Sequence, residues 1–134
     1  YKMLISQGID IVSVKRIARL HEKYKFRFLK KIFSSSELEK FDLKKKNISI
    51  QKFSNRFAAK EAASKALGKG FSDGIRFVDI QIFNNINGKP FLKFEGNAYD
   101  LFKSFEINGK KVKSDISMSN EKDFAIAIVS ISLT

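Results

Sequence analysis

Two acidic residues stand in apolar surroundings, in a chain that otherwise carries a large excess of positive charge. Asp10 lies within the run Gly8-Ile-Asp-Ile-Val12, and Glu61 follows Phe57 by about one helical turn. An ionised carboxylate in such a setting must be paired, bound to a metal ion or protonated. If the two segments pack side by side, the carboxylates converge. Two carboxylates with water and ligand phosphates are a set that Mg²⁺ commonly uses.

Three cations stand near Glu61 in the same segment and could neutralise ligand phosphates, namely Arg56, Lys60 and Lys65. A metal with flanking cations is typical of phosphoryl transfer. Two ordinary explanations stay open at this point. Glu61 could form an intrahelical ion pair with Lys65 at i+4. Asp10 could face water from an edge strand, or cap the next helix.

The segment 50–67 must position Glu61, and its composition predicts a helix. Ala, Leu, Lys and Glu favour helix, no Pro or Gly interrupts the run, and Gly68 stands where a left-handed C-terminal cap is wanted. At about 100° per residue, Phe53 and Phe57 share one stripe with Glu61. Alanines on several other faces let neighbouring backbones come close. We therefore expect a central helix on which Glu61 is partly buried.

The rest of the chain alternates between strand and helix signals. Apolar and β-branched runs predict strands at 4–13, 75–83, 91–95, 112–119 and 124–133. Further helices are expected at 14–24, after a capping box at Ser34–Glu37, and at 97–105. Segment 26–33 is mixed apolar and basic, and 44–47 is expected to be a solvated connection. This order predicts an α+β fold, in which a mainly antiparallel sheet packs on the long central helix.

Composition limits the function further. The chain has 134 residues, of which 43% are apolar, and a formal net charge of +12. We expect one domain over residues 3–134, with Tyr1 and Lys2 outside it. The charge indicates an anionic partner, such as nucleic acid, a membrane surface, a phosphorylated ligand or an acidic protein. The absence of Cys excludes disulfides and thiol catalysis, and the single His21 excludes a His-rich metal site. No apolar run approaches the roughly 20 residues of a membrane helix. We expect a cytoplasmic protein that does not act at a membrane.

Several motifs along the chain together carry a resemblance. In order they are Gly8-Ile-Asp-Ile-Val12 with Arg16-Ile17, Arg56-Phe-Ala-Ala-Lys-Glu-Ala63, Lys65-Ala-Leu-Gly-Lys-Gly70, Gly88-Lys-Pro90 and Ile116-Ser-Met-Ser-Asn-Glu-Lys-Asp-Phe-Ala125. In order and spacing they resemble the holo-acyl-carrier-protein synthase family of 4′-phosphopantetheinyl transferases, over nearly the whole chain from Met3. The resemblance implies transfer of 4′-phosphopantetheine from coenzyme A to a serine of apo-acyl carrier protein. Mg²⁺ dependence, release of adenosine 3′,5′-bisphosphate, a role in fatty acid biosynthesis and a homotrimer with active sites between subunits are implied as well.

The resemblance also assigns roles to individual residues. Asp10 and Glu61 match the Mg²⁺ ligands, and Lys65 matches the lysine that contacts the phosphate, so Glu61 and Lys65 are the expected catalytic residues. Positions that match the coenzyme A-binding residues are Arg56, Lys65, Gly68, Lys69, Gly70, Lys89, Pro90 and Asn120. The surface for the acidic carrier protein is the basic stripe Arg16, Arg19 and Lys23, whose ordinary explanation is a solvated helix face.

Two positions depart from the family pattern. The family usually has His at the position of Asn120, and Asn binds hydrogen-bonding groups but does not titrate near neutrality. A binding role is therefore expected there, and proton transfer is called into question. The usual Gly-Thr-Gly is Gly68-Lys-Gly70, where Lys69 adds a cation.

Two alternatives remain beside the transferase. One is an inactive family member that binds coenzyme A or carrier protein without transfer, which the Asn120 departure motivates. The other is a nucleic-acid-binding module, which the net charge motivates. Against the second, 14 of the 17 aromatic residues are Phe, and no base-stacking signature is present. We therefore expect no nucleic acid partner.

Overall fold

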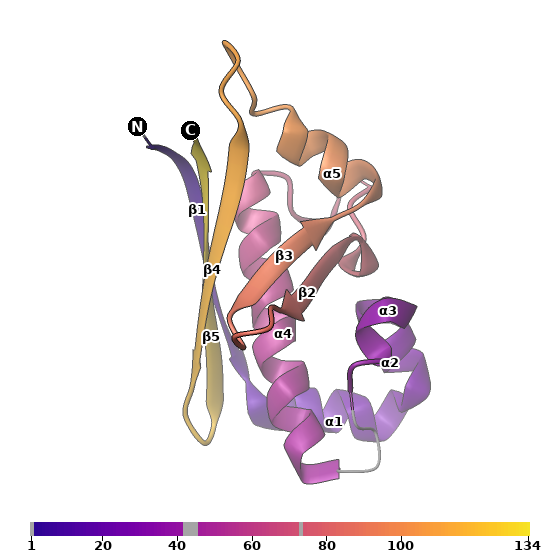
Figure 1. Ribbon diagram of the computed structural model, residues 1–134. Coiled ribbons are helices and arrows are strands. Elements are labelled where there is room, and N and C mark those ends of the chain that lie inside the picture. The colour runs from indigo at the N-terminus through magenta and orange to yellow at the C-terminus, as the bar shows by residue number, and fades with distance from the viewer. Residues whose placement is uncertain (1, 42–45, 73) are drawn as a thin grey trace.

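A long helix packed along one face of an antiparallel sheet dominates the computed structural model, which describes residues 2–41, 46–72 and 74–134. The helix is α4 (Lys46–Leu67), and it lies against strands β1 (Met3–Ser13), β5 (Phe124–Leu133) and β4 (Val112–Asn120), in that order across the sheet (Figure 1). The predicted α+β fold and the central helix are confirmed. The expected connection at 44–47 is wrong where it can be checked, because residues 46 and 47 already belong to α4. Residues 44 and 45 lie outside the described residues.

The contact between β1 and α4 is unusually close because both surfaces carry small residues. A Cβ atom built on Gly8 would lie 2.0 Å from the carbonyl oxygen of Ala62 and 2.6 Å from the amide nitrogen of Ala66. Only glycine therefore fits at this point of β1. The alanines that line α4 are fully buried, among them Ala58, Ala59, Ala62, Ala63 and Ala66.

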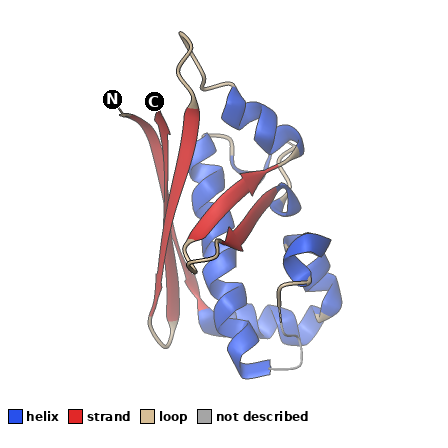
Figure 2. Cartoon of the chain, in the orientation of Figure 1, coloured by secondary structure: helices blue, strands red, loops and turns tan. Residues whose placement is uncertain are grey.

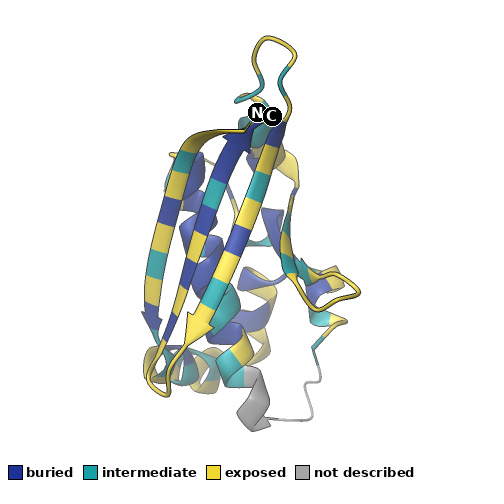
Figure 3. Cartoon of the chain, turned by 60° about the vertical axis from the view of Figure 1, so that its left-hand side comes forward, coloured by how far each residue is buried: buried dark blue, intermediate teal, exposed yellow. Residues whose placement is uncertain are grey.

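Buried and exposed residues alternate along the strands of the three-stranded sheet (Figure 3), so its two faces differ in exposure. Side chains at alternate positions, such as Val12, Ala127 and Val129, point toward α4 and are buried. The opposite face keeps large apolar side chains in contact with solvent. We call it the outer sheet face, and its apolar members are Ile9, Ile11, Phe124, Ile126 and Ile128.

A second, two-stranded antiparallel sheet, β2 (Ile80–Asn84) with β3 (Pro90–Phe94), packs beside α4 (Figure 2). The single sheet of the prediction is thus two sheets. The predicted strand 75–83 begins too early, because Phe77–Asp79 forms a 3₁₀ turn, η2. Two hydrogen bonds of 3.0 and 3.1 Å from Arg76 to the Asp79 carboxylate close this turn. Another 3₁₀ turn, η1 (Gly70–Ser72), and helix α5 (Gly96–Lys103) complete this half of the chain.

Three short helices join β1 to the central helix. Helix α1 (Val14–Tyr24) matches its predicted bounds, and α3 (Ser35–Leu38) begins at the predicted capping box. Helix α2 (Phe26–Ile32) was not predicted as a helix. It is separated from α1 by Lys25 alone, whose φ of 50° turns the chain without the Gly or Pro that marks most breaks. Among the described residues, no helix is long and apolar enough to cross a membrane.

Candidate active site

Strand β1 and helix α4 bring the predicted charged residues together. The Lys65 ammonium lies 3.1 Å from Asp10 Oδ1 and donates a 3.0 Å hydrogen bond to the carbonyl oxygen of Ile9. Asp10 faces the helix, and its side chain is only 15% exposed. The explanation of Asp10 as a water-facing edge residue is therefore wrong. In the described part of the chain, Lys65 pairs with Asp10, and no ion pair links it to Glu61.

Glu61 shares this electrostatic environment. Partial burial raises the pKa of the Glu61 carboxyl, and the nearby negative charge of Asp10 raises it further. The positive charges of Lys65 and Arg16 oppose that increase. The Lys65 ammonium, which pairs with Asp10, belongs to α4 about one turn from Glu61, so both carboxylates lie near this cation.

The donor chemistry at this point fits Mg²⁺. Both side chains offer carboxylate oxygens, which are the ligands that a hard cation prefers. Within residues 2–41, 46–72 and 74–134, no cluster of three or more His, Cys, Asp or Glu side chains is placed to hold a metal. Two carboxylates suit Mg²⁺ because this ion usually keeps several waters and uses substrate phosphates as further ligands.

A cavity of about 560 Å³ opens beside Glu61, and we call it the α1–α2 cavity. Its lining comes from α1, α2, α4 and η2, and comprises Arg16, Leu20, Tyr24, Arg27, Phe28, Lys31, Ile32, Phe57, Glu61 and Phe77. Most of these side chains are apolar, and three cations line the cavity together with one carboxylate. Arg16 lies where the docking stripe was expected. Arg19 and Lys23 are exposed on α1 but do not line the cavity.

Sequence reasoning missed Arg27 and Lys31 of this cavity. The two residues are four apart, a spacing that places them on one face of a helix. That signal was present, but segment 26–33 had not been recognised as helical.

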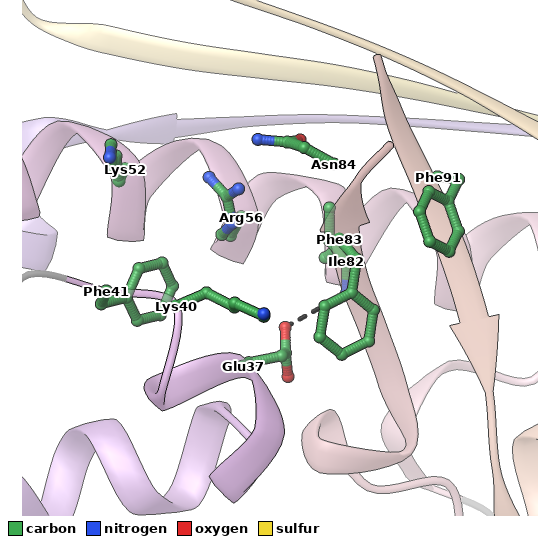
Figure 4. A pocket seen from close by; sticks show the side chains of 9 residues that line it. All are labelled: Glu37, Lys40, Phe41, Lys52, Arg56, Ile82, Phe83, Asn84 and Phe91. Atoms are coloured by element: carbon green, nitrogen blue, oxygen red, sulfur yellow. Dashed lines mark hydrogen bonds between the residues drawn. The ribbon is translucent and has the colours of Figure 1, made fainter. Parts of the chain in front are cut away.

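Two further cavities, each of about 440 Å³, lie elsewhere along α4 and share Arg56 and Asn84. The first, the Arg56 cavity, is lined by Glu37, Lys40, Phe41, Lys52, Arg56, Ile82, Phe83, Asn84 and Phe91 (Figure 4). The second, the hairpin cavity, is lined by Asn55, Arg56, Asn84, Gly88, Lys89, Pro90, Ile116, Ser117 and Met118. The structure thus groups three predicted coenzyme A residues, Arg56, Lys89 and Pro90.

Arg56 and Asn120 are held by specific neighbours. The Arg56 guanidinium lies 5.4 Å from the centre of the Phe41 ring. Burial lowers the pKa of Arg56, and the negative charge of Glu37 opposes that decrease. The Asn120 amide donates a 3.2 Å hydrogen bond to Asn55 Oδ1. Asn55 lines the hairpin cavity, so Asn120 stands at its margin. Asn55, Lys40 and Lys52 were not singled out from the sequence.

The predicted segment Gly68-Lys-Gly70 follows α4 and lines none of these three cavities. Gly68 has a φ of 87° and caps the helix, as predicted, by donating its amide to the carbonyl oxygens of Ser64 and Lys65. Gly70 has a φ of 62°, and nothing lies within 4 Å of a Cβ built on it. The backbone of this segment is therefore open to an approaching ligand.

The predicted residues form two groups on different sides of α4. Glu61 faces the α1–α2 cavity, whereas Arg56 faces the Arg56 and hairpin cavities. Five residues separate them, which corresponds to about 140° around a helix. The structure therefore does not bring all the predicted site residues into one cavity of a single chain.

Comparisons with known proteins match this arrangement to one family. The family model of the 4′-phosphopantetheinyl transferase superfamily matches residues 6–129. The holo-acyl-carrier-protein synthase of Wigglesworthia glossinidia brevipalpis is 40% identical over 129 residues, which cover 94% of this chain and 90% of that protein. The chain belongs to the holo-acyl-carrier-protein synthase family. The resemblance inferred from the motifs is thereby confirmed.

Solved structures of holo-acyl-carrier-protein synthases share the fold. The enzyme from Neisseria meningitidis superimposes with a TM-score of 0.81 at 35% identity, over 96% of this chain and 98% of that chain. The Helicobacter pylori enzyme, solved in complex with coenzyme A, gives a TM-score of 0.74 at 34% identity, over 93% and 98% of the two chains. Because both chains are covered almost completely, the likeness concerns the whole architecture and not one motif.

Proposed function

We propose that this chain transfers 4′-phosphopantetheine from coenzyme A to a serine of an apo-acyl carrier protein, with Mg²⁺, in the cytoplasm and in support of fatty acid biosynthesis. The observation that carries the proposal is the ion pair of Lys65 with Asp10, about one helical turn from Glu61, which lines a cavity with three cations. Membership in the holo-acyl-carrier-protein synthase family and the coenzyme A complex of the Helicobacter pylori relative support it.

Asp10 and Glu61 are the residues that would hold Mg²⁺. When bound, the ion supplies charge stabilisation for the diphosphate of coenzyme A. The Lys65 side chain extends from α4 toward β1 and is 54% exposed. Its ammonium can therefore bind a phosphate oxygen while it remains near Asp10. In the transfer, the serine oxygen forms a bond to the phosphorus that carries pantetheine. The bond from that phosphorus to the oxygen of the leaving bisphosphate breaks.

The serine hydroxyl must lose a proton as it attacks. We assign Glu61 as the acceptor, because its carboxylate lines the cavity that is proposed to receive the serine. A carboxylate within reach of a reacting hydroxyl can act as a general base. Asn120 cannot take this role, since an amide does not titrate near neutrality.

The α1–α2 cavity is the proposed docking surface for the carrier protein. Its apolar lining residues offer contact area, and Arg16, Arg27 and Lys31 attract an acidic partner. A serine presented here lies next to Glu61. Arg19 and Lys23 remain part of the proposed surface as outer contributors, because both are exposed on α1.

The Arg56 and hairpin cavities are the proposed site for the nucleotide end of coenzyme A. Lys40, Lys52 and Arg56 bring three cations to one cavity, and Lys89 and Pro90 line the adjoining one. This set suits a phosphorylated nucleoside, with Asn120 as a hydrogen-bonding neighbour. Lys69 and the open backbone of Gly68 and Gly70 extend the proposed coenzyme A contacts beyond the end of α4.

We also propose that the chain forms a homotrimer whose active sites lie between subunits. The two groups of site residues occupy different sides of α4, so a second copy would complete the site that one copy begins. The outer sheet face supplies an apolar surface for such contacts. In its cross-strand pair Ile9–Ile128, the two residues are 55% and 38% exposed. In the next pair, Ile11–Ile126, they are 60% and 36% exposed.

A carrier-modification assay tests the function. Incubation with coenzyme A, Mg²⁺ and several apo-carrier proteins should add about 340 Da, the mass of phosphopantetheine less water, to a carrier. EDTA should prevent the gain. The absence of any mass gain with all carriers would contradict transfer. An inactive member that only binds would give the same null result while calorimetry still detected coenzyme A.

Mixing two inactive variants tests the shared site. Glu61→Gln and Arg56→Ala damage different sides of α4, so hetero-oligomers should contain some sites with both residues intact. Activity of the mixture well above that of either variant alone is expected. Sedimentation should give a trimer, and Ile128→Glu on the outer sheet face should give monomers. A monomeric wild type, or a mixture without recovered activity, would contradict the proposal.

A further inference from the structure

The most deeply buried ion pair of the described chain joins Lys60 of the central helix to Glu37, a residue that also lines the Arg56 cavity. Glu37 of α3 and Lys60 of α4 are 2.8 Å apart, and their side chains are 1% and 0% exposed. Burial of two charges costs free energy that their attraction does not reliably repay. Apolar residues of similar volume often serve stability equally well. The pair therefore invites an explanation other than stability.

The partners of this pair lie along one edge of strand β2. Lys60 donates hydrogen bonds to the carbonyl oxygens of Ile80 and, at 2.9 Å, Phe77. Glu37 accepts from the amide of Ile82 at 3.2 Å (Figure 4). Ile80 and Ile82 are two apart and present these groups to the same edge, away from β3. The ion pair thus takes the place of a third strand at the free edge of the β2–β3 sheet.

The same pair stands between the two groups of site residues. Glu37 lines the Arg56 cavity, and Phe77 lines the α1–α2 cavity beside Glu61. Strand β2 continues into the turn that carries Lys89 and the hairpin cavity. Lys60 immediately precedes Glu61 in α4. One buried pair therefore connects the hairpin, the 3₁₀ turn η2 and the helix that bears the proposed metal ligand.

We propose that Glu37 and Lys60 are positioning residues that hold the β2–β3 hairpin in register with α4, and so fix the nucleotide cavities relative to Glu61. Neither side chain needs to touch substrate in this role, although Glu37 also lines the Arg56 cavity. They act through the backbone of Ile80 and Ile82 and through the placement of Lys89. The nucleotide part of the inference rests on the proposed function, whereas the coupling of hairpin to helix does not.

Three variants separate positioning from stability. Lys60→Met leaves a buried carboxylate without its partner, so it should lower both the melting temperature and the affinity. Glu37→Leu/Lys60→Met removes both charges and should regain much of the melting temperature. It leaves Ile80 O and Ile82 N–H without partners, so its affinity for adenosine 3′,5′-bisphosphate, measured by calorimetry, should stay at least tenfold below wild type. Lys93→Met, which removes the exposed 3.5 Å ion pair between Lys93 of β3 and Glu95, is the control and should change neither property.

Recovery of affinity together with stability in the double variant would overturn the proposal, because the pair would then act by packing alone. Glu37→Gln keeps the shape of the side chain, and it replaces Lys60→Met as the test variant if Lys60→Met does not fold. It should raise the KM for coenzyme A at least fivefold and change kcat less than twofold, and exchange of the Ile82 amide should be faster. An unchanged KM for coenzyme A together with unchanged hydrogen exchange of the Ile82 amide would also overturn the proposal. A wild type that neither binds the bisphosphate nor modifies any carrier would contradict the proposed function, while Ile82 exchange would still report the coupling.

Discussion

Lys65 and Asp10 form a 3.1 Å ion pair between the central helix and the first strand, and this pair occupies the place where a diphosphate is proposed to bind. The lysine is 54% exposed and the aspartate 15% exposed, so the cation lies on the solvent side. Glu61, five positions from Arg56 and four from Lys65, remains without an ion pair among the described side chains. Because Glu61 has no ion-pair partner among these side chains, its carboxylate can bind a cation from solution.

Glu61→Gln should reduce transfer by about a thousandfold or more, because the amide is a poor Mg²⁺ ligand and cannot accept the serine proton. Its fold should persist. Folding raises the pKa of Glu61, so the folded protein disfavours the charged form, and a neutral isostere should leave the melting temperature in EDTA unchanged or higher. Mg²⁺ should raise the melting temperature of wild type and not of the variant. Glu121→Gln, in the exposed β4–β5 turn, is the matched control. Wild-type activity in Glu61→Gln would remove the metal assignment.

Gly8→Ala should destabilise the protein by about 3 kcal/mol, because the added Cβ would overlap the backbone of α4 at Ala62 and Ala66. Backbone atoms cannot move aside as a flexible side chain can. Asp10, two residues along the strand, would shift with β1, so residual activity should fall further than stability alone explains. Gln7→Ala on the exposed side should change the free energy of unfolding by less than about 0.5 kcal/mol. Denaturant unfolding of both variants checks the difference. Equal changes in the free energy of unfolding for Gly8→Ala and Gln7→Ala would show that β1 can move to accommodate the added Cβ, and would contradict the prediction.

The sequence predicted the elements whose residues carry strong local signals. The central helix, its Gly68 cap, the capping box at Ser34 and both long C-terminal strands follow from propensity and periodicity. Helix α2 was missed because Lys25 supplies a break without Gly or Pro. The 3₁₀ turn η2 was assigned to a strand because segment 75–83 is rich in β-branched and aromatic residues. The hydrogen bonds from Arg76 to Asp79 that close the turn could not be predicted from that composition.

The candidate site was predictable in its chemistry and less so in its arrangement. Asp10 and Glu61 could be paired from their apolar settings, since each needed a partner. The partner of Lys65 could not be predicted, because it depends on how closely β1 approaches α4. Arg27 and Lys31 required α2, and the Glu37–Lys60 pair joins residues 23 positions apart that no local pattern connects.

Arg27→Glu and Lys31→Glu should each raise the KM for the carrier protein by about tenfold at low salt, equivalent to about 1.4 kcal/mol. Both residues line the α1–α2 cavity beside Glu61, and a reversed charge there repels an acidic partner. The KM for coenzyme A should stay constant. Because exposed charges are screened, the effect should diminish at high salt. Lys111→Glu, an equal charge change ahead of β4, should not alter either constant. An effect of Lys111→Glu as large as that of Arg27→Glu would indicate attraction by net charge and not a docking surface.

The Lys60 ammonium should titrate near pH 8, because burial lowers its pKa to about 8, although the Glu37 charge and hydrogen bond oppose that decrease. Folding thus lowers this pKa, and the unfolded chain binds more protons between about pH 8 and pH 10.5. The contribution of Lys60 to the free energy of unfolding should therefore increase as the pH rises through that window, and be constant below it. Resonances of the Lys60 side chain in an NMR titration check the midpoint, with exposed Lys93 as the comparison. A midpoint near 10.5 would show that the pair with Glu37 fully offsets burial.

Lys25→Gly should stabilise the protein by about 1 kcal/mol. Lys25 has φ 50° and ψ −126°, a conformation that glycine adopts readily and that a residue with a Cβ adopts at a cost. The relief should exceed the extra freedom that glycine gives the unfolded chain. Glu22→Gly, three residues earlier within α1, is the matched control and should destabilise by about 1 kcal/mol, because glycine is unfavourable inside a helix. Changes of opposite sign in the free energy of unfolding, measured in urea, would establish that the junction of α1 and α2 is a strained turn.

Since both helices line the α1–α2 cavity, Lys25→Gly should also change the KM for the carrier protein and leave the KM for coenzyme A unaltered. Destabilisation by both variants would contradict the strained conformation.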